Sequence, residues 1–379
     1  MTWLKWMGAI ALVLVAALAL VWVFRFDLII MAAKAGQREF AATQPVDWQT
    51  GPEAAEAPSV ERAPNIVFIL ADDLGFNDLT VGGGGVAGGI VPTPNIDALA
   101  HQGVMFTNGY AGNATCAPSR AAIMTGRYAT RFGFEFTPTP VAFSRVVGTF
   151  RSPGTLHAPR FHADRVKDTP PVDDEAMPAS EITIAEMLRA QGYHTVHLGK
   201  WHLGGAKGAR PEDQGFDESL GFMAGASMYL PPDDPRVVNS KQDFDPIDKF
   251  LWGVLPNAVQ YNGGPYFHAG GYMTDYLTDN AVQVIRANRN RPFFLYLAYN
   301  AVHTPLQATR ADYDALPQIK DHRLRVYAAM VRNLDRNVGR VMAELKAQGL
   351  DDNTLVIFTS DNGGANYIGL PNINQPYRG

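Results

Sequence analysis

The chain has 379 residues, of which 46% are hydrophobic and 18% are charged, and its formal net charge is −5. This length is enough for one large α/β domain or two smaller ones, and the composition is that of a globular protein. The negative charge and the lack of a basic run argue against a nucleic-acid partner. The single cysteine, Cys116, cannot form an internal disulfide bond.

The N-terminus carries an uncharged apolar stretch, residues 6–24, between Lys5 and Arg25. It is about as long as a bilayer-spanning helix, and no clean cleavage site follows it directly. We interpret residues 1–33 as an uncleaved signal-anchor that crosses the membrane, with a cleaved signal peptide as the alternative. The first interpretation predicts an exported, membrane-anchored protein on the periplasmic or extracellular face, and the second predicts a secreted one.

Residues 34–62 are polar, rich in Ala, Pro and Glu, and show little periodicity. This pattern is typical of a tether, so we predict a linker here. The folded catalytic domain is predicted to occupy residues 63–379.

Four apolar runs predict strands that are buried on both faces of a sheet. These runs are residues 66–70, 195–198, 293–297 and 355–358. Helical patterns lie between them: Thr93-Pro94 opens one, Thr183 with Glu186 forms a capping box, and an apolar stripe runs from residue 326 to 345. The alternation predicts an α/β fold, with a mostly parallel central sheet and helices on both faces.

Polar groups follow each of the four predicted strands. Any one of these groups alone is explained by a tight turn, a solvated loop or a structural histidine. Because ligands of such sheets bind beyond the carboxyl ends of the strands, four coincidences predict one shared site. The candidates are Asp72, Asp73, Lys200, His202, His303, Asp361 and Asn362.

Three of these candidates are carboxylates and one is an amide, which are hard oxygen ligands. They favour Ca²⁺, with Mg²⁺ as the alternative, over zinc. Lys200, His202 and His303 add donors for a tetrahedral anion. Sulfate esters and phosphate esters both fit this chemistry.

Cys116 opens the string Cys-Ala-Pro-Ser-Arg, and Thr-Gly-Arg follows at residues 125–127. A lone cysteine is ordinarily a small buried hydrophobe. Here Pro118 predicts the start of a helix, and Arg120 lies on the same helical face as Cys116. The positive end of a helix beside a guanidinium favours anionic chemistry.

The Cys-x-Pro-Ser-Arg string with its downstream Thr-Gly resembles the maturation signature of the sulfatase family. The resemblance extends from about Pro64 to the C-terminus. It implies an alkaline phosphatase-like fold and an arylsulfatase-like enzyme whose cysteine, here Cys116, is converted to formylglycine by a dedicated maturase. It also implies a set of metal ligands: Asp72, Asp73, an oxygen of modified Cys116, Asp361 and Asn362.

The same resemblance implies catalytic roles for the remaining candidates. Arg120 steadies the hydrated aldehyde, Lys200 and His202 contact the sulfate, and His303 is a candidate acid for the leaving group. The implied activity is hydrolysis of sulfate esters, on a small molecule or a sulfated glycan.

Two alternatives stay open at this point. A phosphomonoesterase or phosphonate monoester hydrolase of the same superfamily shares the metal carboxylates. An inactive, membrane-tethered binding remnant is the other, because the family places a further lysine and a C-terminal subdomain after the Asp-Asn-Gly-Gly string. No lysine follows Asp361. We therefore expect the subdomain to be absent and the activity of this chain to be low.

The glycine-rich stretch of residues 82–89 lacks the Gly-Lys-Ser/Thr ending of a phosphate-binding loop. We predict a mobile loop near the site rather than a nucleotide cradle.

Overall fold

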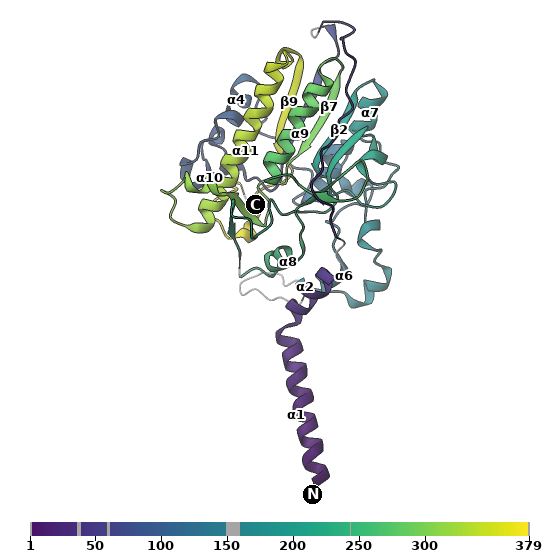
Figure 1. The fold of residues 1–379 in the computed structure, drawn as a ribbon, viewed down its shortest axis with the longest axis vertical. Helices are drawn as coiled ribbons and strands as arrows, with labels where there is room; N and C mark the ends of the chain where they lie inside the picture. Colours follow the sequence, from purple (N-terminus) through teal and green to yellow (C-terminus); the bar gives the residue numbers. More distant parts are fainter. Residues whose placement is uncertain (1, 36–38, 59–60, 149–159, 243, 378–379) are drawn as a thin grey trace.

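The centre of the molecule is a seven-stranded sheet with the order β6-β5-β3-β2-β7-β1-β9. The computed structural model describes residues 2–35, 39–58, 61–148, 160–242 and 244–377. All four predicted strands are confirmed, and they are parallel neighbours in the sheet (Figure 1). Their bounds are β1 (Asn65–Ala71), β2 (His194–Lys200), β7 (Phe293–Ala298) and β9 (Thr354–Ser360).

Three further strands, which the sequence pattern did not predict, extend one side of the sheet. They are β3 (Glu218–Phe222), β5 (Ala258–Tyr261) and β6 (Phe267–His268). β3 pairs in parallel with β2, whereas β5 is antiparallel to both of its neighbours, β3 and β6. A separate antiparallel pair consists of β4 (Val237–Ser240) and β8 (Leu306–Thr309). The prediction of a mostly parallel sheet is confirmed.

Helices cover both faces of the sheet, as predicted. The main ones are α5 (Cys116–Thr125), α7 (Ile184–Ala190), α9 (Met273–Asn288) and α11 (His322–Ala347). Alternate residues of β7 enter two separate hydrophobic clusters. Leu295 and Leu297 pack with side chains of α9 and α11, whereas Phe294 and Tyr296 pack with side chains of α5 and α7. Continuous apolar strands are therefore needed, because each face of the sheet has its own core.

The predicted helix signals lie where the helices begin. α4 (Pro94–Gln102) starts at the predicted Thr93-Pro94 pair. The capping box before α7 is formed: Glu186 N donates to Thr183 Oγ1 at 3.1 Å, and Thr183 N donates to Glu186 Oε2 at 2.8 Å. The apolar stripe of α11 is buried. The remaining α-helices are α1 (Thr2–Val23), α2 (Arg25–Ala35), α3 (Val86–Gly89), α6 (Val141–Val147), α8 (Pro246–Val254) and α10 (Arg310–Asp314).

Short 3-10 helices make up much of the connecting chain. They are η2 (Phe76–Asp78), η3 (Thr80–Gly82), η4 (Ala129–Arg131), η5 (Ala163–Asp168), η6 (Val172–Asp174), η7 (Pro211–Gln214), η8 (Asp351–Asn353) and η9 (Asn366–Ile368). The glycine-rich stretch predicted as a loop contains the end of η3 and all of α3. It is held to the preceding turn because Gly85 N donates to Asn77 O at 2.8 Å.

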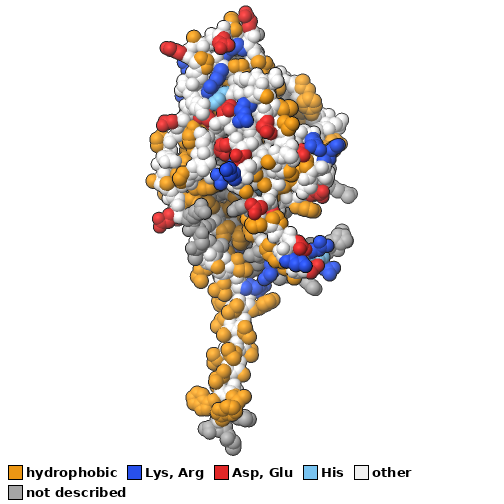
Figure 2. Space-filling model, turned by 90° about the vertical axis from the view of Figure 1, so that its right-hand side faces the viewer, with side chains coloured by type: hydrophobic (Ala, Val, Ile, Leu, Met, Phe, Trp, Pro, Cys, Tyr) orange, Lys and Arg blue, Asp and Glu red, His pale blue; other side chains and the backbone are white. Residues whose placement is uncertain are grey.

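The N-terminal helix α1 projects from the body of the molecule (Figure 1). Residues 6–23 have the length and hydropathy of a membrane span, and none of this window is buried. Figure 2 shows hydrophobic side chains along this projecting helix, below a head of mixed charge. The helix is compatible with a signal-anchor or a signal peptide.

The segment predicted as a linker is docked on the domain over part of its length. Ala41 forms a parallel bridge with Phe267, and Gln49 N donates to Glu218 Oε1 at 3.0 Å. Residues 41–49 therefore form a strap across the antiparallel side of the sheet rather than a free tether. Residues 36–38 and 59–60 of the predicted linker lie outside the described residues.

Candidate active site

The carboxyl edge of the parallel strands brings the predicted groups together. Asp72 follows β1, Lys200 ends β2, and Asp361 follows β9, and all three are fully buried. Lys200 Nζ donates to Asp72 Oδ1 at 2.9 Å and to Asp72 Oδ2 at 2.7 Å. Because each group leaves the end of its own strand, the parallel order of the sheet is what places them in contact.

Helix α5 delivers Arg120 between two of these carboxylates. Arg120 Nε donates to Asp361 Oδ2 at 2.8 Å, and its Nη2 lies 3.2 Å from Asp72 Oδ1. Arg120 Nη1 also donates to Lys200 O at 3.0 Å. The guanidinium is fully buried, so these partners compensate for its lost hydration.

The same helix places Cys116 at its first residue, as predicted, with Thr115 as the N-cap. Cys116 Sγ lies 3.8 Å from Asp73 Oδ1, and Arg120 is one turn further along the same face. Position 116 therefore sits at the positive end of the helix and against the carboxylate cluster.

Asp73 is the meeting point for groups from three other segments. Asn362 Nδ2 donates to Asp73 Oδ1 at 2.6 Å, and His303 Nε2 lies 3.6 Å from Asp73 Oδ2. Tyr367 OH donates to Asp73 Oδ2 at 3.2 Å. Asp73 adopts a left-handed backbone with φ of 55°, a conformation that is uncommon for residues other than glycine.

His202 is buried two residues beyond Lys200, and its Nδ1 has no hydrogen-bond partner among the described residues. A Cβ at Gly225 would lie 2.6 Å from the His202 ring, so glycine is needed for this close approach. Burial lowers the pKa of His202 well below its usual range, and the charges of Lys200 and Arg120 lower it further. The imidazole is therefore neutral at neutral pH.

The charges of the cluster do not balance. Asp72, Asp73 and Asp361 face Lys200 and Arg120, so three carboxylates meet two fixed cations. Burial raises the pKa of Asp361 to about 6, with a further rise from Asp72, although Arg120 and Lys200 oppose both effects. Burial also opposes ionisation of Asp72, but Lys200 and Arg120 outweigh it and lower its pKa. An added cation would relieve this repulsion.

Two observations show that the residues fit a divalent metal ion. Candidate ligand atoms of Asp72, Cys116 and Asp361 lie within 4.8 Å of one another, and so do those of Asp73, Cys116 and His303. Position 116 belongs to both groups. Asn362 Oδ1 is buried without a hydrogen-bond partner among the described residues, which leaves an oxygen free for a cation.

The unmodified thiol of Cys116 is poorly suited to nucleophilic attack. Burial raises its pKa well above the usual range, and the neighbouring carboxylates Asp72 and Asp361 raise it further, against the opposing charge of Lys200. Because the thiolate is the nucleophilic form of cysteine, this environment suppresses ordinary thiol chemistry.

The structure thus brings all nine predicted side chains to one edge of the sheet, with His202 linked to the cluster through its charged neighbours. Two contributors were not predicted. Ser119 Oγ donates to Asp361 O. Ser119 lies within the Cys-x-Pro-Ser-Arg string, three residues after Cys116, so helical spacing was a signal for it. Tyr367 lies in the last twenty residues, and nothing in its local sequence marks it.

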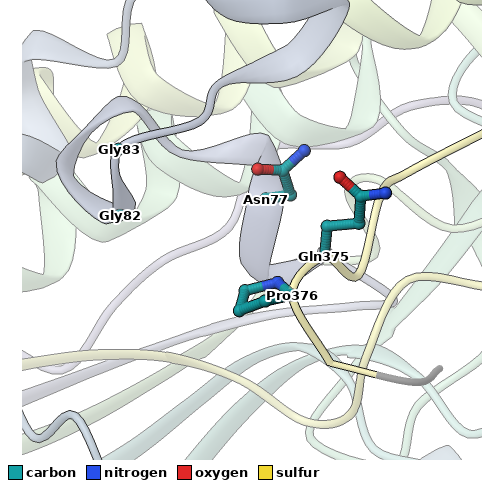
Figure 3. Close-up of a pocket in the computed structure, with 5 residues that line it drawn as sticks. All are labelled: Asn77, Gly82, Gly83, Gln375 and Pro376. Carbon is teal, nitrogen blue, oxygen red and sulfur yellow. The ribbon is translucent and has the colours of Figure 1, made fainter.

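A shallow pocket of about 500 Å³ is lined by none of the predicted residues (Figure 3). Its lining is Asn77, Gly82, Gly83, Gln375 and Pro376. None of these side chains carries a charge, and none is a carboxylate or an imidazole. We place the chemistry at the carboxylate cluster instead.

Comparisons with known proteins agree with this geometry. The sulfatase family model matches residues 64–372. Mouse N-acetylgalactosamine-6-sulfatase is 33% identical over 84% of this chain and 53% of its own length. Mouse arylsulfatase J is 31% identical over 86% of this chain and 46% of its own length. The chain therefore spans about half the length of the curated relatives it matches.

A solved structure with a similar fold also matches the chain. The crystal structure of Ps i-CgsB in complex with k-i-k-neocarrahexaose superposes with a TM-score of 0.64 and 33% sequence identity, over 83% of this chain and 61% of that one. The family signature at Cys116, the sheet topology and the family match all coincide over the same residues. The chain belongs to the sulfatase family.

Proposed function

We propose that this chain hydrolyses sulfate esters, with a formylglycine made from Cys116 by a maturase as its nucleophile. The observation that carries the proposal is the position of Cys116 at a helix N-terminus, between two groups of candidate metal ligands. The suppressed thiol supports it, because the unmodified side chain is unfit for the reaction. When formed, the hydrated aldehyde supplies a hydroxyl that attacks sulfur, and a second hydroxyl whose deprotonation releases sulfate.

The chain's own residues would hold and neutralise the sulfate. Lys200 and Arg120 are buried cations fixed by Asp72 and Asp361, so they need no reorganisation when negative charge develops. His303 has Nδ1 at 2.5 Å from Thr304 O, which fixes the ring and leaves Nε2 toward the cluster. From there it can donate a proton to the leaving alcohol.

Neutral His202 is proposed to donate a hydrogen bond to the sulfate. Asp361 accepts the proton of the attacking hydroxyl in this scheme. Ligand atoms of Asp361 and Cys116 lie within 4.8 Å of one another, which places this carboxylate within reach of a group at position 116.

We propose Ca²⁺ as the metal ion, with Mg²⁺ as the alternative. Its ligands would be Asp72, Asp73, Asp361 and Asn362, with an oxygen of modified Cys116. An all-oxygen set of this size suits a hard cation. The ion would supply positive charge to the sulfate oxygens.

For the substrate we propose a sulfated sugar. One relative is named for N-acetylgalactosamine-6-sulfate, and one solved neighbour at 33% identity was crystallised with neocarrahexaose, so both concern carbohydrates. We further propose export, with α1 retained as a membrane anchor. The apolar window of residues 6–23 is long enough to cross a membrane, which supports an anchor.

The test assays a panel of esters. The chain is co-expressed with a maturase and then solubilised in detergent. Tryptic mass spectrometry first measures conversion of Cys116 to the aldehyde. Sulfate release is then compared for a generic aryl sulfate, 6-sulfated N-acetylgalactosamine and a sulfated galactan oligosaccharide, with the aryl phosphate as the matched ester. We expect sulfate release to exceed phosphate release, with a preference for the sugars. Preferential phosphate release by fully converted protein would replace this function with the phosphatase alternative.

A further inference from the structure

The helix after the membrane span is packed against the catalytic domain. α2 contacts α8, with Asp27 Oδ1 at 3.1 Å from Lys249 Nζ. A Cβ at Gly253 would lie 2.6 Å from Ile30 Cγ2, so the two helices approach closely at this glycine. Figure 1 shows α2, α8 and α6 together at the end of the body from which α1 projects.

The chain connections of α8 place it at the carboxyl edge of the sheet. Only three residues separate its last residue, Val254, from Ala258 at the start of β5. β5 is antiparallel to β3 and pairs Tyr261 with Leu220, so β5 begins beside the carboxyl end of β3. That edge is the one that carries the catalytic groups.

A second contact, independent of the first, holds the end of α2 near the same part of the domain. Ala41 lies six residues after the end of α2 at Ala35 and bridges to Phe267. Phe267 is in β6, which pairs with the first residues of β5, so it too lies near the carboxyl edge. A fully extended run of six residues reaches about 20 Å. Even without the α2–α8 contact, the end of α2 must stay within that distance of the carboxyl edge.

The surface formed by α2 and the start of α8 has the composition of a membrane interface. Met31 is 64% exposed and Phe244, just before α8, is 59% exposed. Arg25 and Lys34 are basic residues of α2, Lys249 of α8 is paired with Asp27, and the Arg323 guanidinium lies 4.9 Å from the Phe244 ring centre. Exposed apolar side chains beside basic ones suit the headgroup region of a bilayer, and α2 follows the span directly.

We infer that the two attachments hold the sulfatase domain with its catalytic edge turned toward the bilayer, so that α2 and the start of α8 rest on the lipid surface. The inference rests on the proposed retention of α1. It assigns the lipid headgroups as the partner of this surface. The catalytic site then faces the space next to the membrane, and a substrate must approach along the membrane surface rather than from bulk solvent.

The test measures how far each edge of the sheet lies from lipid. A donor fluorophore is attached to an engineered cysteine at Phe244 or at Asp351, in the full chain with Cys116→Ala so that one thiol is present. Asp351 is exposed and precedes β9, whose seven residues span about 23 Å. The labelled chains are reconstituted in vesicles with acceptor-labelled lipid headgroups, and flotation confirms that the protein is bound.

Energy transfer should be strong from position 244 and mostly lost from position 351. The matched control inserts a flexible Gly/Ser linker of about 30 residues between Phe24 and Arg25, which leaves the α2–α8 contact intact and frees the domain by roughly 30 Å. This insertion should remove the difference between the two positions. Equal transfer from both positions in the uninserted chain, or stronger transfer from 351, would overturn the inference.

Loss of residues 1–35 on export, detected by intact mass, would also overturn it. That outcome is distinct from failure of the proposed hydrolysis, because sulfate release is measured separately on detergent-solubilised chain with Cys116 in place.

Discussion

Carboxylates are buried at both the amino edge and the carboxyl edge of the central sheet, but their hydrogen-bond and charge partners differ. At the amino edge, Glu218 is fully buried, and its oxygens lie 2.7 Å from His194 Nε2, 2.7 Å from Tyr261 OH and 3.0 Å from Gln49 N. At the carboxyl edge, three carboxylates share two fixed cations, and the amide oxygen of Asn362 has no partner among the described residues.

This difference indicates that Glu218 is a structural carboxylate, whereas the three carboxylates at the carboxyl edge form a candidate functional site. Burial raises the pKa of Glu218, but bonds from His194 and Gln49 outweigh it and lower the pKa below its usual range. Its charge is therefore satisfied by groups already present. At the other edge burial and the charge of Asp72 raise the pKa of Asp361 to about 6, even though Arg120 Nε donates to it. A buried carboxyl group with a pKa raised in this way marks a candidate functional site.

The largest difference between the two edges is expected when Cys116 at the carboxyl edge is replaced. Cys116→Ala should lower sulfate-ester hydrolysis by roughly 10⁴-fold or more, because the nucleophile is lost. The midpoint of thermal unfolding should change little, since alanine fills almost the same space. Both are measured on chain co-expressed with a maturase. Residual activity close to that of the parent would show that position 116 is not the nucleophile.

Removing a buried cation from the same edge should have the next largest effect. Lys200→Met should lower kcat by roughly 10²-fold or more, because a preorganised donor to the anionic transition state is lost. It should also destabilise the fold, because Asp72 loses both of its hydrogen bonds from Nζ. The matched control is Lys207→Met, at an exposed lysine of the following loop. Equal kcat values for the two variants would contradict the role given to Lys200.

A buried carboxyl next to the site tests the electrostatics through pH. Burial raises the pKa of Asp78 from 3.8 to about 7, although bonds from Tyr327 OH and Gly75 N lower it. The folded state therefore holds a proton that the unfolded state releases near pH 4. The stability that this proton contributes is complete below pH 4 and is lost as pH rises toward 7.

Asp78→Asn removes this titration and keeps an acceptor oxygen. The difference in unfolding free energy between the parent and this variant should fall by roughly 2–4 kcal/mol between pH 4 and pH 7. Urea denaturation at saturating Ca²⁺ measures it. A difference that is flat with pH would mean that Asp78 is not buried in the way described.

The amino edge should respond in stability and not in catalysis. Glu218→Gln should lower the unfolding free energy by roughly 1–3 kcal/mol, because a charged acceptor for three donors becomes a neutral one. Its kcat should match that of the parent. A large fall in kcat with unchanged stability would erase the distinction between the two edges.

Of the parallel strands β1, β2, β3, β7 and β9, all but β3 were predicted from sequence, and so was the convergence of the candidate residues at one edge, for physical reasons. Strands buried on both faces read as continuous apolar runs, and groups at their carboxyl ends must converge. The antiparallel strands β5 and β6 were missed because they are short and include Gln260 and His268, whose polar side chains obscure a strand pattern. Tyr367 was missed because its contact with Asp73 joins positions 294 residues apart.

The docking of the strap was not predicted from sequence. Residues 41–49 have no periodicity, because they are held by single contacts such as Trp48 Nε1 with Asn280 Oδ1 at 3.2 Å rather than by a repeating pattern. Composition alone indicates a tether for such a segment. Its docking depends on partners, such as Glu218 and Phe267, that only the folded domain presents.

Calcium titration of one variant at each edge tests most directly the claim that the carboxyl edge holds the metal-dependent active site. Asp361→Asn and Glu218→Gln each neutralise one buried carboxylate with little change of shape, at the carboxyl and amino edges respectively. Calorimetric titration with Ca²⁺ should give one ion per chain for the parent and for Glu218→Gln, and at least tenfold weaker binding for Asp361→Asn, a loss of about 1.4 kcal/mol or more. Equal Ca²⁺ affinity for Asp361→Asn and the parent would contradict the assignment of the carboxyl edge as the metal-dependent active site.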